Sequence, residues 1–172
     1  MLFKRVLQIL DIVTERASYF FVYVSGFLAV VMAFLATFGV IKRYVLNDPE
    51  PYTYELSTIF LLLGVIFAIP YVQNVHRNLR VDVIANRFPK VVQDILANFV
   101  TPLLGLFFLV PMVWKSWEIA FYSLQIGERS PTIWSPPLFP IKILIPIGVG
   151  LLCLVLLVQL CHGVSSLIQR IR

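Results

Sequence analysis

Charge is scarce in this sequence of 172 residues, of which 13% are charged and 59% are apolar. Soluble domains carry roughly 25% charged and 45–50% apolar residues, and so short a chain cannot bury that much apolar surface in its own core. Most of this surface must therefore face lipid or another membrane protein. The net charge of +5 comes from basic residues that stand singly or in pairs between apolar stretches. This pattern is typical of membrane orientation rather than of nucleic-acid binding.

Residues suited to catalysis or cofactor binding are equally few. The sequence has two histidines and two cysteines, and it shows no metal-ligand spacing, Gly-rich phosphate loop or nucleophile-base-acid set. Cys153 and Cys161 are eight residues apart in one apolar stretch, about 12 Å along a helix, which is too far for a disulfide. We therefore expect a protein that is not an enzyme and that holds no metal or cofactor of its own.

Four uncharged apolar stretches predict an all-α membrane protein with four transmembrane helices in a single domain, residues 1–172. The second stretch, residues 56–75, would form a helix of about 30 Å, the thickness of a bilayer's hydrocarbon core. The first covers residues 18–41. The third covers residues 95–114, or 95–124 if Lys115 and Glu118 pair along one helix face. The fourth covers residues 143–168, or 136–168 if Ser135 and Pro136 are the N-cap and first helical residue.

The N-terminal segment and the basic residues predict the topology. Residues 2–16 place apolar side chains at helical spacing, which predicts a short amphipathic helix in the membrane interface; a simple extension of the first span is the alternative. Nine of the 14 Lys and Arg residues lie in the N-terminal segment, the loop after residue 75 and the C-terminal tail, and five lie in the other two loops. This excess predicts that both termini are cytoplasmic.

The spans contain small residues at regular spacing but no charge near their middles. Ion-coupled pathways usually need intramembrane charges or broken helices, so we do not expect this chain to carry a substrate alone. The small residues predict faces where helices pack closely, within the chain or against a partner. They are Ser25, Ala29, Ala33 and Thr37 in the first span, and Gly64 and Ala68 in the second.

Polar residues flank the second span. Arg43 and Glu55 are expected on one side of the membrane, where they could pair, and Asp82 could cap a following helix. His76 and His162 are both expected toward the cytoplasmic side, where two helices could hold a haem between imidazoles. A haem-binding four-helix anchor of an electron-transfer complex is therefore the alternative function, and a self-sufficient small transporter is a third.

Considered together and in order, these polar residues are similar to those of a known family. The chain resembles the small membrane subunit of tripartite ATP-independent periplasmic (TRAP) transporters over nearly its whole length. An aromatic residue, Tyr52 or Tyr54, precedes Glu55 where the family commonly has Trp, and Asn78 replaces the family's usual His. The remaining matching residues are Arg43, Tyr44, Val45, Asn47, Arg80, Asp82, Gln125, Gly127, Ser130, Pro131, Pro146 and Gly148.

The resemblance implies a noncatalytic, multi-pass protein of the bacterial inner membrane. It would form a heterodimer with a much larger subunit that carries sodium coupling and the substrate, an organic acid such as a dicarboxylate or sialic acid. The small subunit would brace the static scaffold of that partner, and a periplasmic binding protein would deliver the substrate. Exposed charges steer docking, so the candidates for touching the binding protein are Asp48, Glu50, Glu128 and Arg129.

Overall fold

The computed structural model describes residues 2–48, 50–75, 89–132 and 134–171. The first two helices are α1 (Leu2–Tyr44) and α2 (Pro51–Val75). A third helical stretch consists of α4 (Lys90–Ile95), a π-helical segment η1 (Leu96–Val100) and α5 (Thr101–Gln125), and α6 (Phe139–Ile171) follows. Four of these helices, α1, α2, α5 and α6, are long and apolar enough to cross a membrane. The prediction of an all-α protein with four spans is therefore confirmed.

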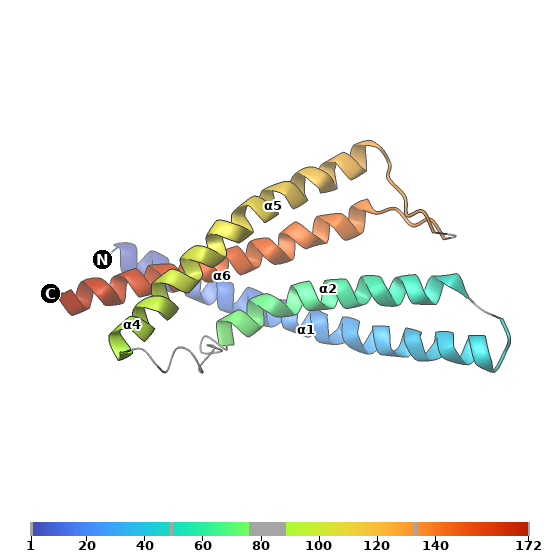
Figure 1. The fold of residues 1–172 in the computed structure, drawn as a ribbon, viewed down its shortest axis with the longest axis horizontal. Helices are drawn as coiled ribbons and strands as arrows, with labels where there is room; N and C mark the ends of the chain where they lie inside the picture. Colours follow the sequence, from blue (N-terminus) through green and yellow to red (C-terminus); the bar gives the residue numbers. More distant parts are fainter. Residues whose placement is uncertain (1, 49, 76–88, 133, 172) are drawn as a thin grey trace.

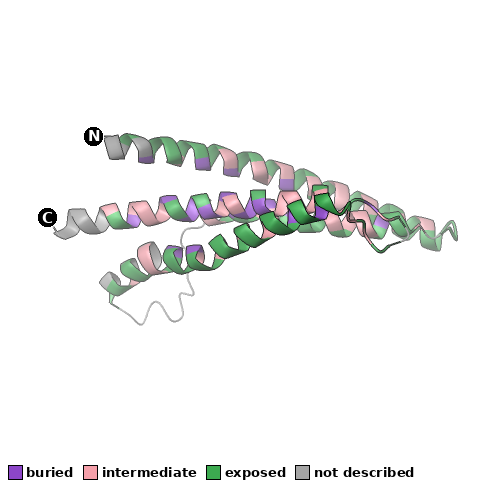
Figure 2. Cartoon of the chain, turned by 90° about the horizontal axis from the view of Figure 1, so that it is seen from above, coloured by how far each residue is buried: buried purple, intermediate pink, exposed green. Residues whose placement is uncertain are grey.

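The helices run alternately up and down, so the two chain termini lie at one end of the molecule (Figure 1). We call this the terminal end. The opposite end, which we call the loop end, carries the connection from α1 to α2 and the connection from α5 to α6. Helix α6 packs against α1, α2 and α5, and it contains most of the buried apolar side chains. Figure 2 shows that large parts of α1 and α5 are exposed.

Helices α1 and α2 pack along a seam with a seven-residue repeat. Ser25 on this seam donates a hydrogen bond of 2.7 Å to the backbone oxygen of Gly64. Fourteen residues later, at the same helical register, a Cβ added to Gly39 would lie 2.9 Å from Cγ2 of Thr53. Because two heptads return to one face of a helix, Ser25 and Gly39 face the same neighbour. Their small side chains allow the two backbones to approach closely.

The first 16 residues do not form a separate interfacial helix, so that prediction is wrong, and the alternative, an extension of the first span, is confirmed. The segment is the beginning of α1, which continues without interruption from Leu2 to Tyr44. No Gly or Pro occurs before Gly26, so the chain contains no residue that would break the helix at this junction. Leu7 and Thr14 are buried, and Asp11 contacts α6, which holds this first part of α1 against the bundle.

The third helical stretch starts earlier and extends further than the shorter prediction. It begins at Lys90 and ends at Gln125, and Lys115 contacts Glu118 at 2.7 Å. The continued helix and this predicted pair are therefore confirmed. The π segment stands directly before Pro102, where the Thr101 hydroxyl donates to the Leu96 carbonyl. A proline lacks the N–H that an α-helix needs, so the backbone hydrogen bonding changes at this point.

The fourth helix begins at Phe139 rather than at Pro136, which corrects the earlier of the two predicted starts. The backbone N–H groups of Ile141 and Lys142 donate to the carbonyl of Leu138, so the helical hydrogen bonds start there. Ser135 has a positive φ of 49° and is not the N-cap. The residues between 135 and 139 instead form part of a hairpin-like loop, because their backbone groups pair with the other side of that loop.

Candidate functional site

The loop end gathers charged side chains into short pairs. Lys42, on the last turn of α1, contacts Asp48 at 3.0 Å and Glu50 at 3.1 Å. The lysine side chain is only 19% exposed, whereas that of Asp48 is 69% exposed. Lys42 is at the same register as the α1–α2 seam, and its side chain therefore points toward the start of α2. These three residues fix the turn that joins the first two helices.

The loop between α5 and α6 is closed in a similar way. The Ser130 N–H donates to the backbone carbonyl of Pro136, and the Leu138 N–H donates to the backbone carbonyl of Glu128, both at 3.0 Å. The Glu128 carboxylate also accepts a short hydrogen bond from the Lys142 ammonium. This bond holds the pKa of the Glu128 carboxyl below its ordinary value. Glu128 is thus ionised at neutral pH and is tied to the start of α6.

The same loop docks on the first turn of α2. The Thr132 hydroxyl lies 2.9 Å and 2.8 Å from the two carboxylate oxygens of Glu55. The rings of Tyr52 and Trp134 meet edge to face, with centroids 5.9 Å apart. These contacts anchor the loop between α5 and α6 to the start of α2. Sequence reasoning missed this contact because the residues lie almost 80 positions apart.

The predicted pair between Arg43 and Glu55 is not formed. The Arg43 guanidinium lies 5.6 Å from the centroid of the Tyr44 ring, and Glu55 is bound by Thr132 instead. The reason is register, because Arg43 is one residue beyond Lys42 and points about 100° away from the seam with α2. Asn47 has a positive φ of 53°, a conformation that asparagine tolerates better than most residues. It turns the chain after α1.

The four residues predicted to touch a binding protein all lie at the loop end. Asp48, Glu50 and Glu128 are each paired with a lysine of this chain. Arg129 is exposed and makes no ion pair within the described part of the chain. Unlike the other three charges, the Arg129 charge has no ion-pair partner in the described ranges and is available to another protein.

The predicted small-residue stripe on α1 does not follow a single face. Ser25 is buried against Gly64, whereas Ala29, Ala33 and Thr37 are exposed. The Thr37 hydroxyl donates to the carbonyl of Ala33, which satisfies it within the helix. Each step of four residues turns the face by about 40°, so Thr37 points well away from the direction of Ser25. On α2, Gly64 is buried and Ala68 is half-buried.

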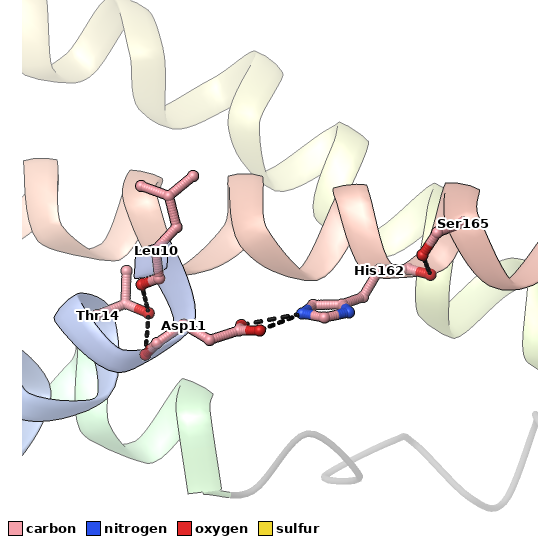
Figure 3. A network of polar contacts seen from close by, with 5 residues as sticks. All are labelled: Leu10, Asp11, Thr14, His162 and Ser165. Carbon is pink, nitrogen blue, oxygen red and sulfur yellow. Dashed lines mark hydrogen bonds and ion pairs between the residues drawn. The ribbon is translucent and has the colours of Figure 1, made fainter. Parts of the chain in front are cut away.

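The terminal end contains a polar contact between α1 and α6 that the sequence did not reveal. Nε2 of His162 lies 2.7 Å and 2.9 Å from the two carboxylate oxygens of Asp11 (Figure 3). Near this contact, the Thr14 hydroxyl donates to the backbone carbonyls of Leu10 and Asp11. The Ser165 hydroxyl donates to the backbone carbonyl of His162. A polar cleft of about 410 Å³ opens there, lined by Asp11, Glu15, Tyr19, Asn74, Val75 and His162.

This geometry does not favour the haem alternative. The Asp11 carboxylate engages Nε2 of His162, so this nitrogen is already committed to a contact within the chain. His76, the other proposed ligand, lies outside the described ranges, as do Asn78, Arg80 and Asp82.

A second polar contact joins α2 and α6 deeper in the bundle. The Gln73 side-chain amide donates to the side-chain oxygen of Gln159 at 3.0 Å. In return, the Gln159 amide donates to the backbone oxygen of Gln73 at 3.1 Å. Gln159, a single amide in an apolar stretch, was a signal for this contact, because polar side chains at membrane depth usually bond to another helix.

Fold and site together define a polytopic membrane protein of four helices whose polar chemistry is concentrated at the helix ends. Residues 32–166 match the family described as tripartite ATP-independent periplasmic transporters, DctQ component. The match begins within α1 and ends near the end of α6, so it covers most of the chain. The chain belongs to this family, which is the small membrane component of TRAP transporters. No curated protein and no solved structure gives a match.

Proposed function

We propose that this chain is a noncatalytic scaffold subunit of a TRAP transporter in the bacterial inner membrane. The observation that carries the proposal is the family match, which extends over parts of all four spanning helices. Members of the family generally work with a large membrane subunit and a periplasmic binding protein. In this proposal sodium coupling and the substrate, an organic acid such as a dicarboxylate or sialic acid, belong to the large subunit. The small subunit braces the part of the partner that stays still.

The exposed small residues of α1 are the proposed contact with the large subunit. Gly26, Ala29, Ala33 and Ala36 are all exposed, and their spacing of three and four residues places them on one stripe of the helix. Lipid chains do not require small side chains, whereas a close helix–helix approach does. A spanning helix of the large subunit is therefore the proposed neighbour of this stripe.

Purification from native membranes in mild detergent tests this proposal. We expect a large polytopic protein to copurify, and we expect the eluate to show no Soret absorbance. The double variant Ala29→Leu, Ala33→Leu should reduce recovery of the partner, because the larger side chains separate the helices. Val30→Leu, at an exposed site beside the stripe, is the matched control. Redox subunits with a haem band would contradict the proposal.

The loop end is the proposed docking surface for the binding protein, with both termini in the cytoplasm. Arg129 is the most informative residue to test, because reversing its charge breaks no ion pair within the described part of the chain. Arg129→Glu should slow association with the binding protein and alter its salt dependence, since rim charges mainly act on the association rate. Arg5→Glu, an exposed change at the terminal end, should leave that rate unchanged. Equal rates for wild type and Arg129→Glu would remove Arg129 from the docking surface.

A further inference from the structure

An apolar groove lies between α5 and α6 on the surface of the bundle. Its volume is about 590 Å³, and its walls include Val110, Val113, Cys153 and Leu154. Figure 1 shows the two helices diverging toward the loop end. Gly150 forms part of the lining, and no atom lies within 4 Å of the position that a Cβ would occupy there. The groove is therefore open where a larger residue would close it.

Residues of the membrane interface stand at one end of this groove. Trp114, Trp117 and Glu118 line it, and Lys115 contacts Glu118 at 2.7 Å. The two charged side chains are 70% and 59% exposed, so both charges can be reached from outside. Tryptophan collects at the level of the lipid headgroups, and lysine side chains extend toward the same layer. The groove thus runs from an apolar interior to a polar mouth that carries one charge of each sign.

The residues that line the groove decide between a helix and a lipid chain as the occupant. A partner helix crossing the membrane would need a much longer groove lined by small residues, and here the walls are mostly tryptophan, valine and leucine. A flexible acyl chain fits such a space without those requirements.

We propose that the groove binds a zwitterionic phospholipid, with one acyl chain lying along Gly150 and Leu154 and the headgroup at Lys115 and Glu118. The phosphate would pair with the Lys115 ammonium, and the headgroup ammonium would pair with the Glu118 carboxylate. A headgroup with only negative charge would gain the first contact but would be repelled by Glu118. The site consequently favours phosphatidylethanolamine over phosphatidylglycerol. This inference stands apart from the scaffold function, because it uses only α5 and α6 of this chain.

Photolabelling tests the acyl-chain part. The full chain is reconstituted in vesicles of phosphatidylethanolamine and phosphatidylglycerol that contain a phosphatidylethanolamine with a photoreactive acyl chain, and adducts are mapped by mass spectrometry. We expect adducts on residues 110–118 and 150–154, and Gly150→Leu should lower them about tenfold, a binding loss of about 1.4 kcal/mol. Val65→Leu is the control, because Val65 is exposed on α2 and does not line the groove. Labelling that Gly150→Leu leaves unchanged would overturn the proposal.

Two further measurements test which headgroup binds and whether a protein segment, rather than a lipid, fills the groove. Lys115→Gln should reduce the labelling of the groove, and a photoreactive phosphatidylglycerol should label it less than the phosphatidylethanolamine probe does. Equal labelling by the two probes would overturn the headgroup assignment.

The phosphatidylethanolamine probe is then used in native membranes that contain the whole transporter. Adducts in the groove there support the lipid, whereas their loss, together with a cross-link from Cys153 to the large subunit, would show that a protein segment fills the groove.

Discussion

At the scale of single residues, two of the glycines on α6, Gly148 and Gly150, have opposite surroundings. A Cβ added to Gly148 would clash with Cγ2 of Ile66 and would lie 3.2 Å from a ring carbon of Phe67. Gly150, two residues later, meets nothing within 4 Å. The absence of a side chain at Gly148 therefore lets α6 approach α2 closely, whereas at Gly150 it leaves the groove open.

This contrast predicts opposite effects of the same substitution. Gly148→Ala should destabilise the protein by about 1–3 kcal/mol, the usual cost of overpacking, because the branched Ile66 side chain cannot move away freely. Gly150→Ala should be neutral or stabilise by up to about 1 kcal/mol, since alanine favours helix. Unfolding by denaturing detergent, monitored by circular dichroism, measures both. Equal stabilities of the two variants would contradict the close contact at Gly148.

A second residue-scale prediction concerns the acid stability given by Glu128 and Lys142. The contact with Lys142 lowers the pKa of the folded Glu128 carboxyl from its ordinary value near 4.5. The pair therefore contributes stability above that value, and the contribution is lost as the pH falls through the lower, folded pKa. Between about pH 6 and pH 3, the melting temperature of the wild type should fall more than that of Glu128→Gln.

The matched variant for this pair is Lys142→Gln. It should show the same smaller fall as Glu128→Gln, and the double variant should resemble either single one, because all three lack the same contact. Scanning fluorimetry in detergent over this pH range provides the melting temperatures. A pH dependence that is identical in the wild type and all three variants would show that the pair does not contribute to stability.

At the scale of helices, α2 and α6 are joined by reciprocal hydrogen bonds between Gln73 and Gln159. Gln73→Leu or Gln159→Leu alone should destabilise by about 1–2 kcal/mol, because each leaves a polar partner without its bond. The double leucine variant should lose clearly less than the sum of the two single losses, since it leaves neither amide unpaired. A double-mutant cycle from detergent unfolding measures the coupling. Strictly additive losses would show that the two side chains act independently.

The sequence predicted the helices better than it predicted their contacts. A long uncharged stretch such as residues 56–75 identifies a span by itself, because the required length and apolarity are local properties. The helix starts were predicted less well. Ser135 and Pro136 resemble an N-cap and a first helical residue, but residues around them pair across the loop, so α6 begins at Phe139. The α1 stripe failed as a single face because spacing by four drifts around a helix, whereas the real seam alternates spacings of three and four.

The candidate site was predictable only in part, and the reason is distance along the chain. The predicted pair of Lys115 and Glu118 lies within one turn and forms. Thr132 with Glu55, and His162 with Asp11, join residues 77 and 151 positions apart. Composition and periodicity carry no information about such pairs, because they depend on how the helices are arranged after folding.

At the scale of the whole molecule, the arrangement of the helices places both termini together and both interhelical loops at the far end. Crossing the membrane four times therefore separates the two ends onto opposite sides. The excess of Lys and Arg near the termini and in the loop after residue 75 predicts that the terminal end is cytoplasmic. This assignment determines which surface can meet a periplasmic binding protein, so it is the prediction on which the docking surface depends.

Single-cysteine labelling tests this orientation directly. In a background with Cys153→Ala and Cys161→Ala, the exposed sites Arg129→Cys and Arg5→Cys report on the loop end and the terminal end. A membrane-impermeant maleimide should label Arg129→Cys in spheroplasts, and it should label Arg5→Cys only after the membrane is permeabilised. The reverse pattern would place the loop end in the cytoplasm. Docking of the binding protein at Arg129 would then be impossible, even though family membership and association with a large subunit would be unaffected.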